Sequence, residues 1–174
     1  MGIFDRFRGR SGPGDGPGDG SGAADSAAPD DGASADTMDV APIEEILTRA
    51  PTTSEQEQLD AARDRYADHD IDPGHIDSIA RAYDRALATT DGAEDTHGSD
   101  VVAVISVALG DHLVDEAGYR WVVSTDPFGS DLAVAPPRRG APVVTRTLVA
   151  VRWMSRESGW IPGVAEHLAR AGRR

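Results

Sequence analysis

Four polar side chains in the second half of the chain have the types needed for chemistry: Asp111, His112, Asp126 and Asp131. The first two are adjacent, and the other two lie within the stretch WVVSTDPFGSDLAV, residues 121–134. Carboxylates and an imidazole that converge in a cleft can bind a cation or act as general acid and base. One interpretation is therefore a hydrolytic or metal-dependent enzyme that uses these residues in a cleft between a long helix and a hairpin.

The residues between the two later aspartates indicate a tight turn instead. Asp126-Pro127-Phe128-Gly129 has Asp, Pro and Gly at the positions that a type I turn favours. Gly129 would supply the positive φ of a hairpin bulge, and Asp126 would accept backbone N–H groups across the turn. Because the neighbouring sequence supplies neither further ligands nor a pocket, we assign no catalytic residue here.

Other candidate sites fail on spacing or composition. The segment DHDIDPGH, residues 68–75, alternates Asp as a calcium loop does, but Pro73 stands where Gly is required and Ile79 where Glu is required. The five histidines show no paired metal-ligand spacing, and the chain has no cysteine. We therefore expect no metal, no cofactor and no disulfide.

The charge of the chain bears on its partners. Its 174 residues carry a formal net charge of -13, and all 17 basic residues are arginine. This acidity works against nucleic-acid binding and favours a basic protein partner. No apolar run approaches the ~18–20 residues that cross a bilayer, and the N-terminus lacks the apolar core of a signal peptide. A cytoplasmic location is expected.

Composition divides the chain into three regions. Residues 1–10, MGIFDRFRGR, form a short basic and apolar segment in which Ile3, Phe4 and Phe7 would share a helix face. Such a segment makes weak contact with a membrane surface, docks on a partner, or remains a frayed tail. Residues 11–40 are rich in Gly, Pro, Ala and Asp, which predicts a disordered linker. Residues 41–174 are expected to form a single α+β domain.

Within residues 41–174, patterns predict several helices. Apolar residues Ile43, Ile46 and Leu47 predict a first helix that Pro51 ends, and Thr53 with Gln56 resembles a capping box. Asp72-Pro73 would begin the next helix, whose apolar positions have the clearest helical period in the chain. These positions are Ile76, Ile79, Ala80, Tyr83 and Leu87.

A long helix should follow from an N-cap at Ser99 to a left-handed Gly118. Its inward residues would be Val101, Ile105, Ala108, Leu109 and Leu113, and its outward residues Asp111, Asp115 and Glu116. Gly110 costs about 1 kcal/mol relative to alanine inside a helix, so we expect a close neighbour there.

Strand-forming residues dominate the next segment. Residues 119–125 and 132–135 predict a hairpin that Pro136 and Pro137 end, and residues 141–144 would add a third strand. Residues 144–157 fit a strand or a helix; we favour a short strand and then a helix with Leu148, Val151 and Met154 inward. A last helix begins at Ile161-Pro162, with Val164, Ala165 and Leu168 inward. The fold class is α+β, several helices packed on a small antiparallel hairpin or three-strand meander.

Residues 108–134, ALGDHLVDEAGYRWVVSTDPFGSDLAV, resemble the core of an uncharacterised bacterial family of domains of unknown function, DUF3806. The resemblance implies an α+β domain and brings with it no known activity, cofactor or catalytic residue. The matching positions are Gly110, Asp111, Leu113, Val114, Gly118, Trp121, Thr125, Asp126, Gly129, Asp131, Leu132 and Ala133.

These observations favour a non-enzymatic protein-interaction module over the enzyme interpretation. The acidic domain would be tethered by residues 11–40 to the docking segment 1–10, which raises its effective concentration near whatever that segment binds. One form of such a module is an immunity-type protein that neutralises a basic toxin by covering its surface; another is an accessory protein.

Overall fold

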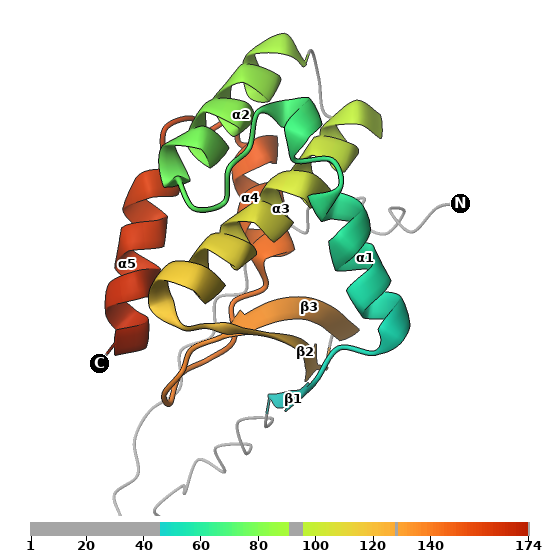
Figure 1. The fold of residues 1–174 in the computed structure, drawn as a ribbon, viewed down its shortest axis with the longest axis vertical. Coiled ribbons are helices and arrows are strands. Elements are labelled where there is room, and N and C mark those ends of the chain that lie inside the picture. The colour runs from blue at the N-terminus through green and yellow to red at the C-terminus, as the bar shows by residue number, and fades with distance from the viewer. Residues whose placement is uncertain (1–45, 91–95, 128, 174) are drawn as a thin grey trace, which may run out of the picture. The chain divides into compact units, whose positions relative to one another are not determined.

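Helices on one face of a small sheet make up the part of the chain that the computed structural model describes, residues 46–90, 96–127 and 129–173 (Figure 1). For residues 96–99 it describes the backbone alone. The predictions for residues 1–10 and 11–40, and for Ile43, lie outside the described residues. No helix within the described ranges is long and apolar enough to span a membrane.

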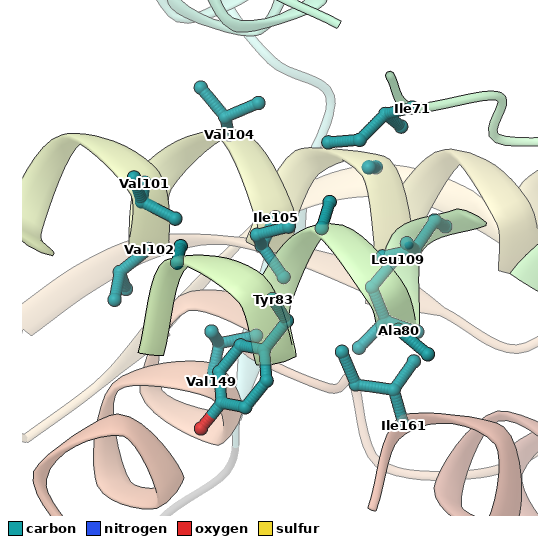
Figure 2. Packing of buried hydrophobic residues seen from close by; sticks show 14 of the residues in the cluster. Ile71, Ala80, Tyr83, Val101, Val102, Val104, Ile105, Leu109, Val149 and Ile161 are labelled. Atoms are coloured by element: carbon teal, nitrogen blue, oxygen red, sulfur yellow. The ribbon is translucent and has the colours of Figure 1, made fainter. Parts of the chain in front are cut away.

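The helices enclose the main core. Helix α2 (Ile76–Thr89) and α3 (Thr96–Ala117) pack on α4 (Thr145–Met154) and α5 (Ile161–Arg173). Every predicted inward position of α3 is buried, and so are Ile79, Ala80, Tyr83 and Leu87 of α2. Figure 2 shows Tyr83 extending from α2 toward Val149 of α4. The Tyr83 ring meets Trp153 and Trp160 edge-on, each with 5.6 Å between ring centroids.

The sheet has three antiparallel strands in the order β1 (Leu47–Arg49), β2 (Arg120–Asp126), β3 (Gly129–Ala135). The predicted α+β class and the hairpin are therefore confirmed. Gly129 has φ +148° and donates its N–H to Asp126 Oδ1 at 3.1 Å, as the turn requires. Pairing runs without interruption from Arg120–Ala135 to Asp126–Gly129, so the bulge expected at Gly129 is not part of this ladder.

The third strand is formed by a segment near the start of the domain, Leu47–Arg49, and not by residues 141–144 as predicted. Leu47–Arg49, predicted as helical, pairs with β2 along Val123–Thr125. Short apolar runs fit either structure, and here the unfilled edge of β2 decides in favour of a strand. On the other side of the hairpin, the segment 141–144 contributes only a bridge between Val143 and Val134.

Helix α1 (Thr53–Arg63) begins one residue earlier than predicted. Thr52 is the N-cap, and it forms a capping box with Glu55 rather than the expected pair of Thr53 and Gln56. Arg49 at the end of β1 binds the Glu55 carboxylate at 2.7 Å. The hydrogen bond from Arg49, followed by the one from the Thr52 backbone, lowers the pKa of Glu55 to about 2. The cap thus ties the strand to the helix.

Two other helix starts also differ from prediction. Helix α2 begins at Ile76 with His75 as N-cap, because Asp72 uses its carboxylate to accept the Gly74 N–H instead of capping. Helix α3 begins at Thr96, three residues before the predicted cap at Ser99. Its end is as predicted: Gly118 has φ +69° and donates its N–H to the Val114 carbonyl at 3.2 Å, as in the αL capping motif.

Residues 144–157 contain the favoured helix, α4, but not the short strand before it, since the one bridge here lies at Val143. The predicted inward face of α4 is wrong. Val149 and Trp153 are buried, whereas Val151 is 49% and Met154 67% exposed, and Leu148 is partly buried. On α5 the predicted face is confirmed for Ala165, with Val164 and Leu168 partly buried.

Gly110 has the close neighbour that we predicted from the unfavourable helix propensity of glycine. A Cβ atom at this position would lie 2.2 Å from Cζ2 of Trp121, well inside van der Waals contact. The indole of β2 therefore rests directly on the backbone of α3. Trp121 and its neighbours Leu113, Tyr119 and Val134 form a second apolar cluster between helix and sheet.

Replacing Gly110 by alanine should lower the free energy of unfolding by about 1–3 kcal/mol, the usual cost of overpacking. The matched control is Gly163→Ala on α5, where an added Cβ meets no atom within 4 Å. That substitution should instead stabilise by about 0.4–1 kcal/mol. Urea denaturation measures both, and equal effects of the two substitutions would contradict the close contact.

Candidate functional site

Asp111, expected to point outward, is instead the centre of a hydrogen-bond network. Arg63 donates through Nη2 to Oδ1 at 2.7 Å and through Nε to Oδ2 at 2.9 Å. Tyr66 Oη donates to Oδ2 at 2.8 Å, and Trp121 Nε1 donates to Oδ1 at 2.9 Å. The Asp111 side chain is only 13% exposed. The outward prediction is wrong for this residue because its donors come from elements distant in sequence, whereas it is right for Asp115 and Glu116.

The network favours an ionised carboxylate. Burial alone would raise the pKa of Asp111, but the hydrogen bonds from Arg63, Trp121 and Tyr66 outweigh it and hold that pKa below its ordinary value. Burial and the nearby carboxylate raise the pKa of Tyr66. The hydrogen bond to Asp111 raises the pKa of Arg63. A carboxylate that already accepts four hydrogen bonds has little capacity left to bind a substrate or a proton.

His112 lies beside a different hollow. Its Nδ1 is 2.8 Å from the carbonyl oxygen of Pro73, which orients the ring toward the loop before α2. The open hollow there is about 650 Å³ and is lined by Asp72, His75 and Glu116 among others. Hydrogen bonds from His75 and the Gly74 N–H lower the pKa of Asp72. Among the residues that the structure describes, no three His, Cys, Asp or Glu side chains are placed to hold a metal ion.

Asp126 and Asp131 are the one predicted pair that the structure brings together. They line an open hollow of about 540 Å³ at the tip of the hairpin. The opposite wall comes from α4 and the residues before it, and it is largely aliphatic. The remaining lining residues are Val143, Val144, Thr147, Leu148, Val151 and Arg152.

The four residues of the enzyme interpretation thus occupy three places. Asp111 lies in its own network, His112 at the loop before α2, and the two hairpin aspartates at the hollow beside α4. Next to Asp111 the Trp121 indole lies directly against α3 at Gly110. The hollow of about 100 Å³ that α3 and the hairpin line together has none of these four residues in its lining. Sequence patterns missed Arg63, Tyr66 and Trp121 as partners of Asp111. The one indication in the neighbouring sequence was Gly110, whose presence inside a helix predicted a close contact next to Asp111.

The fold and these sites define an α+β domain in which a helix and a hairpin are joined through a partly buried carboxylate. The family model described as Domain of unknown function (DUF3806) matches residues 76–163, just over half of the chain. The chain belongs to this family, which confirms the resemblance of residues 108–134. No curated protein and no solved structure matches the chain.

Asp111→Asn should lower the free energy of unfolding at neutral pH by about 1–3 kcal/mol, because Arg63 loses its charged partner in a half-buried site. Since the folded pKa lies below the unfolded value of about 3.9, the stabilisation is present above that value. It is lost as the pH falls through the folded pKa. Denaturation from pH 7 to 2 should therefore show the variant and the original chain converging in acid. The exposed Asp115→Asn control should follow the original curve throughout, and a constant gap for Asp111→Asn would contradict the assignment.

Proposed function

We propose that this chain is a non-enzymatic protein-interaction module. The observation that carries the proposal is the hollow between the hairpin tip and α4, which combines two exposed carboxylates with aliphatic side chains, among them the half-exposed Val151. An apolar floor with a polar rim is typical of a surface that a partner covers. The other candidate, Asp111, is occupied by contacts that serve the fold.

The charge of the chain defines the partner in outline. A net charge of -13 favours association with a basic protein and speeds encounter with it. A neutralising, immunity-type protein and an accessory protein both fit this description. A cytoplasmic location and a tether formed by residues 1–10 and 11–40 belong to the same proposal. In that arrangement the tether would confine the domain near its partner, or hold it weakly at a membrane surface through Ile3, Phe4 and Phe7.

The proposal is tested by affinity capture with the full chain against a chain that lacks residues 1–10. We expect the full chain to capture a basic protein through its domain. The chain without residues 1–10 should capture it more weakly or lose its localisation, and the two chains should have the same melting temperature. Retention of every partner and of localisation by the deletion would remove the tether. Failure of the full chain to retain any protein would count against the interaction module itself.

The enzyme alternative makes a different prediction for divalent cations. A metal site stabilises the folded state in proportion to its occupancy, so Mg²⁺, Ca²⁺, Mn²⁺ or Zn²⁺ would raise the melting temperature. We expect no such rise, either in the original chain or in Asp126→Asn and Asp131→Asn. A rise that both substitutions abolish, and that Asp115→Asn leaves intact, would instead support a cation site at the hairpin.

A further inference from the structure

We propose that the open edge of β3, at Ser130 and Leu132, binds an extended segment of a partner protein that carries basic and aliphatic side chains. The segment would add to the sheet as a further strand and fill the hollow beside α4. This inference rests on the proposed function and specifies how the interaction is made.

The backbone of β3 has the geometry that strand addition needs. Val134 exchanges both backbone hydrogen bonds with Val143 at 2.9 Å, so its N–H and C=O point away from β2. In an antiparallel ladder this direction alternates along the strand. The N–H and C=O of Leu132 and Ser130 therefore point the same way. Among the described residues no strand lies beyond β3, and the bridge at Val143 is its only pairing on that side.

The chain leaves the edge where the hollow begins. After the bridge at Val143 the chain enters α4 at Thr145. Among the described residues, no segment therefore pairs with the outer edge of β3 from Leu132 to the hairpin tip. Val143, Val144, Leu148 and Val151 then form an aliphatic wall opposite the strand. A peptide on the edge would therefore gain backbone hydrogen bonds on one side and apolar contacts on the other, as in known cases of strand addition.

Charge selects the peptide. Asp126 and Asp131 stand at the mouth of the hollow, and both are exposed. Against these two carboxylates the lining has one cation, Arg152, whose charge is paired with Glu157 at 3.8 Å. Its guanidinium lies 4.6 Å from the Trp160 ring centroid and donates to the Leu148 carbonyl. The rim therefore keeps a negative field that suits arginine or lysine on an incoming segment.

The same carboxylates disfavour a second copy of this chain. Two β3 edges paired antiparallel about a two-fold axis would bring Asp131 of one copy near Asp131 of the other, and like charges across strands are destabilising. An edge charge of this kind protects against self-pairing while leaving the edge available to a basic segment. We therefore assign the site to a different, basic protein.

The test uses a fluorescent ten-residue peptide of alternating arginine and valine, titrated into the full chain and followed by anisotropy. Ser130→Pro removes an N–H that faces the open edge and leaves the pairs with β2 intact, because Ser130 faces Thr125 at a position that makes no ladder bond to β2. Ser130→Ala is the matched control, since it loses only the hydroxyl contact with Thr125. We expect Ser130→Pro to weaken binding about tenfold, because one backbone hydrogen bond to the peptide is lost. Ser130→Ala keeps that hydrogen bond and should weaken binding less than about twofold.

A second measurement keeps the test valid if Ser130→Pro fails to fold. The same peptide with N-methyl groups on every residue keeps its charge but loses the strand donors of both edges, and it should bind the original chain about tenfold more weakly. Asp131→Asn should weaken the unmodified peptide and reduce the salt dependence of its binding. Equal binding of the two peptides, or of Ser130→Pro and Ser130→Ala, would overturn the inference and leave only non-specific attraction to an acidic protein.

The remaining outcomes separate this inference from the proposed function. If the full chain captures a protein equally well with Ser130→Pro and with Ser130→Ala, the interaction module stands and the β3 edge is not its site. Self-association abolished by Ser130→Pro would assign the edge to a second copy and overturn the assignment to a basic partner. No capture and no peptide binding would defeat both proposals together.

Discussion

The contact between Trp121 and the backbone of Gly110 determines how the hairpin lies on the helices. Only a residue without a side chain lets the indole approach α3 this closely, and the approach places its N–H within 2.9 Å of Asp111. The carboxylate then accepts from Arg63 and Tyr66 as well, so one partly buried charge joins β2, α3 and the end of α1. A carboxylate that is largely withdrawn from water is stable only when its lone pairs are satisfied, which makes these donors interdependent.

A second aromatic residue, Tyr119, which immediately precedes β2, also packs against a helix glycine. Tyr119 follows the Gly118 turn, donates its hydroxyl to the Leu168 carbonyl at 2.9 Å and rests on Gly172 of α5. A Cβ at Gly172 would lie 2.6 Å from the Tyr119 ring. Two glycine–aromatic contacts therefore fix the start of the hairpin against two helices. The direction of the hairpin, and with it the position of the β3 edge, follows from them.

Sequence patterns predicted correctly several features that depend on residues close together in the chain. The helical period of α2, the left-handed Gly118 and the turn closed by Asp126 and Gly129 depend on neighbouring residues, and all three are confirmed. The starts of α1 and α2 were missed through a choice between neighbouring cap residues, whereas the misses in element type and in buried face depend on distant partners. Leu47–Arg49 became a strand because β2 offers it an edge, and α4 turned Val149 and Trp153 inward because α3 and Tyr83 supply their contacts. Asp111 has the pattern of an exposed residue, and only tertiary structure brings its three donors to it.

The described fold extends beyond the residues that match the family model. The match begins at Ile76, whereas Arg63 and Tyr66, two of the three donor residues to Asp111, precede it. Strand β1 also precedes the match, and it covers the edge of β2 that the hairpin leaves free. The segment from Leu47 to Tyr66 is therefore an integral part of the domain rather than an appendage. It pairs with three of the seven residues of β2, Val123–Thr125, whereas among the described residues the outer edge of β3 is met by a single bridge at Val134.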